Sequence, residues 1–465
     1  MSNPSSETTE RQGNILMRFM LFTVMISSMS ALMFNIVLPQ IGEEFRLSLP
    51  EVSWLSTAYT LIYAFGTVTY GKLADRFQLK SLLTFGLTLF AAGSLLGFLS
   101  QSFAMALVGR CLQSAGAAAV PAMALMIPIR YFPAEKRGSA ISMTAVGIAL
   151  GGALGPVVAA LLASVAGWRW LFVPSLLMIA LIPLFRKHLK DEPLGEIRKF
   201  DWLGGLLLAA SSAAILLGVT QRSWVYGAAG VAALILFVWR IRTIKSGDPF
   251  VQPRLFRNRE YTVMLVLSFL ISCFGISLYF LTPILLSNVY HLEAGWIGLA
   301  MVPAAIASSI LGRKGGKLSD RRGNAYLLSI ASCLLIVCFL LLSIFAGVAA
   351  PWISVFLIFG NVGQSFVQIA MSNAVSRTLP KDQAGVGMGL FSMINFISQG
   401  IAAGVYGVLA ISGTSITWNP LNAFPSSATF SNLYLVLAGL HILILLVYRM
   451  RFAPRKLETV VAVKR

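Results

Sequence analysis

Charged residues are scarce in this chain, and their scarcity excludes a water-soluble fold. They make up 11 % of the 465 residues, whereas soluble globular domains carry about 25 %. The hydrophobic fraction is 57 % and the mean hydropathy is +0.79, so the chain has too few polar groups to cover a surface that faces water. We therefore expect a membrane protein that lies mostly within the bilayer.

Cysteine and histidine are also scarce. The four cysteines lie in apolar runs without the spacing of metal ligands, which excludes a disulfide scaffold and favours packed core thiols. No Walker loop is present, so we do not expect ATP to drive the protein directly. The three histidines are scattered and form no catalytic or metal-ligand arrangement: His188, His291 and His441. We expect neither an enzyme nor a protein with a cofactor or metal.

Long apolar runs are abundant instead. A spanning helix needs roughly 20 mainly apolar residues to cross about 30 Å of hydrocarbon. The first run lacks the small-residue cleavage site of a signal peptide, so we expect it to be the first permanent span. The fold class predicted is an all-α membrane protein with fourteen spans: 14–38, 52–70, 81–100, 103–129, 139–165, 170–185, 202–220, 225–239, 262–287, 295–312, 326–347, 352–372, 386–411 and 432–448.

The distribution of basic residues supports this count. Of the 36 Lys and Arg, Arg46, Arg169 and Arg222 fall in the outer loops and Arg110 inside a span, which leaves 32 in the inner loops. Such asymmetry follows the positive-inside rule, and one missed span would reverse it in all later loops. We expect a multi-pass protein of the plasma membrane with both termini in the cytoplasm. The net charge of +19 then reflects topology, and no nucleic-acid partner is required.

Two motifs recur at nearly the same spacing. Residues 71–76 (GKLADR) recur 245 positions later as 316–321 (GKLSDR), and residues 130–138 match 377–385 at an offset of 247. An even number of spans separates the copies, so the halves are parallel, which suits a transporter that rocks around a central site. The predicted organisation is a cytoplasmic tail (1–13), an N-terminal six-helix bundle (14–186), a linker with a two-helix insert (187–261), a C-terminal six-helix bundle (262–448) and a second tail (449–465).

Several of these segments resemble the major facilitator superfamily, in particular its fourteen-span drug:proton antiporters. The loop 71–80 is similar to the motif G-x-L-a-D-r-x-G-r/k-k, although Gln78 stands where glycine is usual. Residues 109–116 are similar to the R-x-x-Q-G-x-G signature of the fourth span, and residues 147–156 to the drug-antiporter motif of the fifth. The resemblance implies the major facilitator fold and export of drugs in exchange for protons.

Within that branch the chain looks most like the tetracycline efflux proteins of Gram-positive bacteria. The similar stretches are 70–75, 113–121 and 248–251. This resemblance implies tetracycline-like drugs as the first substrates to consider. The partners expected are therefore a small-molecule substrate, a proton and the lipid bilayer, for a protein that we expect to be a monomer.

The repeated loops contain the candidate gating residues. The carboxylate of Asp75 can accept hydrogen bonds from a neighbouring helix N-terminus or pair with an arginine near the eleventh core span. Such a contact would hold one state and release when the halves rock. The alternative is a solvated loop that only obeys the positive-inside rule. The gating set is Gly71, Lys72, Asp75, Arg76, Asp320 and Arg321.

Arg110 is the only basic residue in the interior of a predicted span. A charge at that depth is costly and usually faces a cavity or a partner. It therefore marks the path of the substrate or proton, unless backbone carbonyls and Gln113 satisfy it as a structural arginine. Other residues that could line this path, or could equally form interhelical hydrogen bonds, are Gln113, Asn35, Tyr59, Tyr63, Gln364, Asn395 and Gln399.

The predicted fifth span carries small residues at every fourth position, Gly147, Gly151 and Gly155, followed by Pro156. This spacing lets helices approach closely, and proline would kink the span. Packing alone accounts for such glycines. The resemblance to drug antiporters adds a role in sealing the central path and setting the direction of export.

Carboxylates are absent from the middle of the predicted spans. All 17 Asp and Glu fall in loops or at span ends, the deepest being Glu51, Asp201 and Glu293. Related antiporters carry acids about where this chain has Ser30, Ala31, Gly151 or Gly152, and Gln399. Arg110 without a nearby acid favours neutral or anionic solutes, and proton coupling would have to pass through Asp75, Glu51 or His441.

The sequence thus predicts a secondary transporter that exports small amphiphilic compounds by alternating access, coupled to protons. The alternative is an exporter or facilitator of a neutral or anionic metabolite that uses no buried carboxylate.

Overall fold

The computed structural model describes residues 4–190, 201–220, 223–244, 249–380, 383–411 and 416–452, and all regular structure within these ranges is helical. Parts of the predicted tails (1–3 and 453–465) and of the predicted linker (191–200, 221–222 and 245–248) lie outside the described residues, and so does Arg222 of the predicted outer loops.

The N-terminal half forms one bundle with two buried clusters of apolar side chains. Its helices are α1 (Pro4–Phe45), α2 (Leu49–Val52), α3 (Trp54–Ala74), α4 (Leu79–Phe98), α5 (Phe103–Ala117), α6 (Ala119–Tyr131), α7 (Arg137–Val165), α8 (Val173–Leu176) and α9 (Met178–His188). Helices α5 and α6 follow one another directly and together cover the predicted fourth span.

The C-terminal half forms a second bundle around the largest apolar cluster. Its helices are α12 (Arg254–Arg257), α13 (Arg259–Gly275), α14 (Ser277–Asn288), α15 (Ala294–Arg322), α16 (Asn324–Phe345), α17 (Ala350–Thr378), α18 (Ala384–Ile411) and α19 (Ala428–Phe452). Between the two bundles in sequence lies a hairpin of α10 (Trp202–Thr220) and α11 (Trp224–Thr243). It corresponds to the two-helix insert predicted from the sequence, and we call it the insert.

Thirteen stretches among the described residues are long and apolar enough to span a membrane. The predicted span 52–70 corresponds to helix α3, which is not among the thirteen. Its 21 residues include four threonines and three tyrosines, which lower its hydropathy. The count of fourteen spans therefore stays a prediction.

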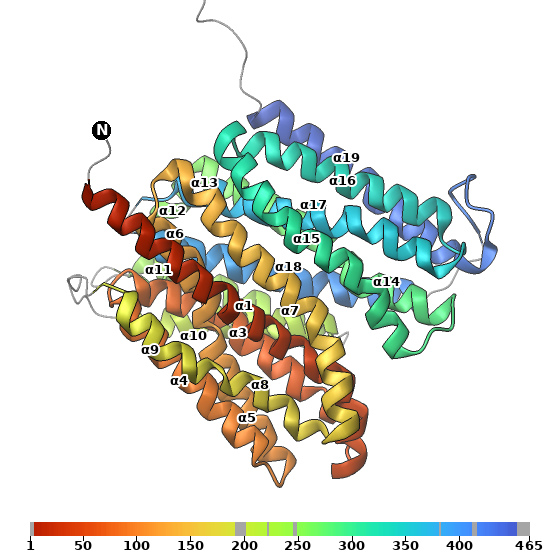
Figure 1. Ribbon diagram of the computed structural model, residues 1–465, viewed down its shortest axis with the longest axis horizontal. Coiled ribbons are helices and arrows are strands. Elements are labelled where there is room, and N and C mark those ends of the chain that lie inside the picture. Colours follow the sequence, from red (N-terminus) through yellow and green to blue (C-terminus); the bar gives the residue numbers. More distant parts are fainter. Residues whose placement is uncertain are drawn as a thin grey trace, which may run out of the picture.

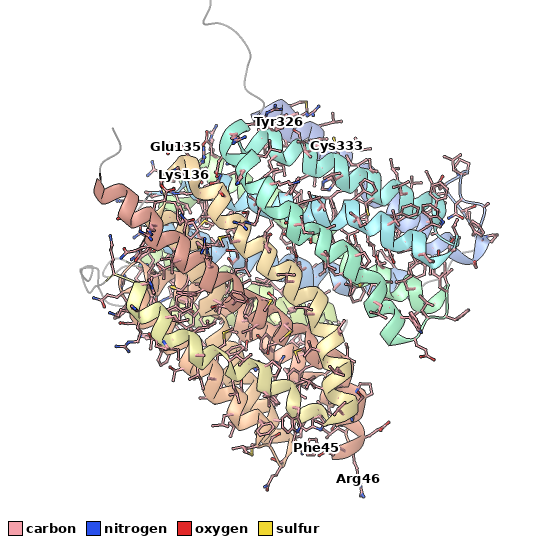
Figure 2. The ribbon with its side chains drawn as sticks, in the orientation of Figure 1. Phe45, Arg46, Glu135, Lys136, Tyr326 and Cys333 are labelled. Carbon is pink, nitrogen blue, oxygen red and sulfur yellow. The ribbon has the colours of Figure 1, made fainter. Side chains whose placement is uncertain are left out.

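The halves meet along two helix pairs, α3 with α18 and α7 with α15. Both repeated motifs lie at one end of the molecule, which we call the motif end. Residues 71–74 belong to α3 and residues 316–321 to α15, so the helices extend into the segments predicted as loops. The two bundles run together there and splay apart toward their other ends (Figure 1). Lys136, predicted in an inner loop, and Arg46, predicted in an outer loop, lie at opposite ends of the N-terminal half (Figure 2).

Candidate functional site

Arg110 lies in the interior of the N-terminal bundle with none of its surface exposed. Helices α4 and α5 pack very closely here, since a Cβ at Gly93 would collide with the backbone of Gly109 and Gln113. This contact aligns the polar side chains of the two helices. The guanidinium of Arg110 donates to Oε1 of Gln113 at 2.5 Å, and Nε2 of Gln113 donates to the hydroxyl of Ser94 at 2.8 Å.

Two aromatic rings flank the guanidinium. Its central carbon lies 4.1 Å from the ring centre of Phe34 and 4.0 Å from that of Tyr59. Nη1 also donates to the carbonyl of Ser30 at 3.4 Å, whereas Nε and Nη2 have no hydrogen-bond partner within the described part of the chain. Buried cation–π contacts contribute up to about 2 kcal/mol each. The stack therefore holds a buried cation in place without a carboxylate and leaves two donors unused.

A chain of aromatic rings leads from this stack to the other half. Tyr59 stacks on Tyr63 with ring centres 5.9 Å apart, and Tyr63 meets Phe396 of α18 edge-on at 4.7 Å. Gln399 lies about one turn beyond Phe396 on α18. Arg110, Gln113, Tyr59 and Tyr63 thus form one connected group that runs from the interior of the N-terminal bundle to the interface of the halves.

The remaining residues of the predicted path do not join this group. Asn35 is exposed, and its Oδ1 accepts a hydrogen bond from Ser56. Asn395 is buried within the C-terminal half, where Ser272 donates to it at 2.8 Å. Gln364 lies against Gly275 in the same half. For Asn35 and Asn395 the structure therefore shows interhelical hydrogen bonds.

At the motif end, Asp75 bridges the two halves. Its carboxylate accepts hydrogen bonds from the backbone amides of Gly385 at 2.7 Å and Val386 at 2.9 Å, at the start of α18. Free amides and the helix dipole at a helix N-terminus both favour a negative charge. We call this contact the α3–α18 latch. Gly71 permits it, because a Cβ there would collide with the carbonyl of Gly385.

The repeat produces a second contact of the same kind. Asp320 on α15 accepts hydrogen bonds from the amides of Gly138 and Ser139 at the start of α7, both at 2.8 Å. We call this contact the α7–α15 latch. Arg76 and Arg321 follow the two aspartates at the same end, and Arg321 is exposed. Each half thus caps a helix of the other half with the aspartate of its own repeated motif.

Burial raises the pKa of Asp75 to about 6, although hydrogen bonds from Val386 and Gly385 and the charges of Lys72 and Arg130 lower it. A carboxyl group with this pKa can exchange a proton near neutral pH. The hydrogen bonds that Ser48 donates to Glu51 hold the pKa of that exposed carboxyl below its usual range. Glu51 is therefore a poor proton carrier compared with Asp75.

His441 is 1 % exposed and lies between Phe274 and Phe339, with ring centres 6.4 and 6.3 Å away. Neither ring nitrogen has a hydrogen-bond partner in the described residues. These apolar surroundings without a relay partner favour His441 as a packed side chain over a proton relay.

The glycines of the predicted antiporter motif pack against α1. A Cβ at Gly147 would meet the backbone of Leu21, and one at Gly151 the backbone of Met25, while Gly155 lies beside Met29. Pro156 falls within α7, but its side chain is outside the described part of the structure. These glycines bring α7 and α1 together within the N-terminal half.

The model of the Major Facilitator Superfamily family matches residues 20–403. The chain belongs to this superfamily. Relatives include the riboflavin transporter RibZ of Clostridioides difficile, 29 % identical over 66 % of this chain and 68 % of the relative. Multidrug resistance protein 3 of Bacillus subtilis is 26 % identical over 81 % of this chain and 75 % of its own. The solved structure of the proton:xylose symporter XylE is similar with a TM-score of 0.65 at 13 % identity, covering 96 % of each chain.

Membership of the major facilitator superfamily makes this chain a multi-pass membrane transporter, not an enzyme. Sequence reasoning did not identify Phe34 or Ser94, which complete the surroundings of Arg110. A signal for Phe34 was present, since it lies one helical turn from Ser30 and therefore on the same face of α1. No comparable pattern pointed to Ser94.

Proposed function

We propose that the protein exports small amphiphilic compounds across the plasma membrane by alternating access, with its termini and its motif end in the cytoplasm. Three features support this. The basic residues gather in the predicted inner loops, each half latches the other at the motif end, and relatives carry the names of multidrug and lincomycin resistance proteins. In this reading the structure is closed toward the cytoplasm.

The surroundings of Arg110 carry the proposal about substrate charge. Its guanidinium offers two unused donors between two aromatic rings and makes no ion pair among the described residues. Such a site favours planar compounds with acceptor oxygens that are neutral or anionic, and it repels cations. Tetracycline, which the sequence resemblance suggests, carries many such oxygens and is the first compound to test.

A second candidate function is export of a neutral or anionic metabolite. The same cationic site without a carboxylate favours it, and one relative is named a riboflavin transporter. Either function requires a substrate that reaches Arg110 from the face where the halves meet. The two differ in their dependence on ions.

Proton coupling through Asp75 is the further part of the proposal. A partly buried carboxylate with a pKa of about 6 that bridges both halves supports it, because protonation and movement would then involve the same group. This arrangement would not need an acid at the midplane.

The test is uptake of tetracycline into everted membrane vesicles with an acid interior, with and without an ionophore that collapses the proton gradient. We expect accumulation that needs the gradient and is lost in Arg110→Ala vesicles holding equal amounts of folded protein. Accumulation that ignores the gradient would favour a facilitator. No accumulation would remove tetracycline and favour the metabolite, to be tried next with riboflavin in the same vesicles.

A further inference from the structure

The segment of residues 249–252, which we call the strap, follows the insert and lies at the interface between the halves. Phe250 is fully buried and Val251 is 1 % exposed. On one side, the carbonyl of Pro249 accepts a hydrogen bond from Nζ of Lys72 on α3 at 3.0 Å. On the other, Oε1 of Gln252 accepts one at 2.8 Å from Gln383, the residue before α18. The strap therefore contacts both sides of the α3–α18 latch.

Phe250 fits between the insert and the N-terminal half. Its ring stacks on Phe65 of α3 with centres 6.2 Å apart and also lies against Gly205 of α10. A Cβ at Gly205 would lie 3.0 Å from the Phe250 ring, so glycine leaves the space that this ring occupies. Withdrawing the ring would expose a large apolar surface.

A buried carboxylate ties the strap to the insert. Asp201, 5 % exposed, accepts hydrogen bonds from the amides of Phe250 at 3.2 Å and Gly204 at 2.9 Å. It also pairs with Arg240 of α11 at 2.7 Å. One side chain thus joins the start of α10, the end of α11 and the strap, so that the hairpin and the strap behave as one piece.

The insert itself packs on the C-terminal half. Leu216 of α10 lies against Gly400 of α18, and Val219 lies against Gly404 one turn further. The insert and the strap are thus fixed along α18, and they contact α3 through Phe250 and Pro249. If the halves separate at the motif end, these contacts with α3 must break.

Among the residues that the structure describes, this brace lies beside one of the two repeated motifs only. Lys72 and Lys317 occupy equivalent positions of the repeat, yet Lys72 is 3 % exposed beneath the strap and Lys317 is exposed. From the repeat alone, we would expect the two latches to have the same surroundings. The strap makes the α3–α18 latch the more enclosed of the two.

We propose that the two-helix insert is a brace that holds the motif end closed, and that Phe250 is the residue through which it acts. This role rests on the alternating access of the proposed function. Opening of the motif end then includes withdrawal of the Phe250 ring from between Phe65 and Gly205. Phe250 is a positioning residue, whose ring stacks on Phe65 of α3.

The test is hydrogen–deuterium exchange of the purified full chain in lipid nanodiscs, without substrate. The readout is exchange of the backbone amides at the start of α18, where Gly385 and Val386 bind Asp75. Removing a buried phenylalanine ring changes an equilibrium by at least about tenfold. We therefore expect Phe250→Ala to raise exchange there by about tenfold or more.

Phe185→Ala is the matched control, because Phe185 is equally buried but packs within the N-terminal half against Phe19. Equal exchange at the start of α18 in the two variants would overturn the proposal, as would exchange unchanged from the wild type. If Phe250→Ala does not fold, Phe250→Leu is compared with Phe185→Leu, with a smaller change expected in the same direction. The readout needs no substrate, so failure of tetracycline transport leaves it unaffected.

Discussion

Protonation of Asp75 should strengthen the α3–α18 latch over a defined range of pH. In the closed latch, burial raises the pKa of Asp75 from 3.8 to about 6, against the hydrogen bonds of Val386 and Gly385 and the charges of Lys72 and Arg130. When the motif end opens, water reaches the carboxyl group and its pKa returns toward its ordinary value. The closed state therefore binds more protons. Its added stability is complete below about pH 4 and is lost as the pH rises through about 6.

The magnitude follows from the two pKa values. Between pH 7 and pH 5 the closed state takes up nearly one proton that the open state does not, and one pKa unit corresponds to about 1.4 kcal/mol. Acidification over this range should favour the closed latch by roughly tenfold. Electrostatic screening changes this little, since the carboxylate of Asp75 is largely enclosed where α3 meets the start of α18.

The assay is amide exchange at Gly385 and Val386 at pH 5 and pH 7, with each rate divided by the intrinsic rate at that pH. Asp75→Asn should abolish the difference, because an amide does not titrate in this range. Glu51→Gln should keep it, because that carboxylate is exposed and remains ionised at both pH values. Equal protection of the wild-type protein at the two pH values would refute the reasoning, and so would a difference that persists in Asp75→Asn.

Two further predictions concern the α3–α18 latch and the substrate path. Gly71→Ala places a Cβ against the carbonyl of Gly385 and should raise exchange at the start of α18. The control Gly295→Ala adds a Cβ that meets nothing within 4 Å and should leave this exchange unchanged. Equal exchange in both variants would show that the close approach of Gly71 to Gly385 is dispensable. Arg110→Ala should abolish transport, and Arg110→Lys, which keeps the charge but loses the planar stack and its two unused donors, should reduce it by at least about tenfold. Near-normal transport by a well-folded Arg110→Ala protein, checked by thermal unfolding, would remove Arg110 from the substrate path.

The short loops of the repeat made the position of Asp75 predictable. A two-span spacing returns the chain to the same side of a membrane, so the loops after equivalent spans lie at one end. The start of α18 lies there too, because residues 377–385 repeat 130–138. Arg110 was predictable for a different reason, since a charge within a span needs enclosure.

The hydrogen bonds of Arg110 to Gln113 and to a backbone carbonyl agree with the structural alternative raised from the sequence, but its aromatic partners could not be predicted in the same way. Phe34 and Tyr59 come from α1 and α3, and a sequence does not fix how far each helix rotates about its axis. Packing fixes it, through close contacts such as that between Gly93 and Gly109.

The insert illustrates the same limit. Helix α10 is apolar on all sides, and such a pattern does not tell which face meets α18. The hairpin was predictable from its two short spans and the brief connection between them. The contact of the insert with Phe250 was not predictable. The ring is placed by Gly205 and Asp201, which lie at the start of the insert about 45 to 50 positions earlier.

The separation of Arg110 from Asp75 constrains how proton and substrate can be coupled. They share no hydrogen bond in the described structure, so a proton on Asp75 acts on the substrate only by changing the balance between the closed and open motif ends. Linkage is reciprocal. A compound that binds the closed state more tightly must raise the proton affinity of Asp75, and protonation of Asp75 must raise the affinity for the compound by the same factor. A substrate that shifts the pH midpoint of exchange at Gly385 upward in wild-type protein, but has no effect in Asp75→Asn, would therefore identify both the coupling group and the state that the substrate prefers.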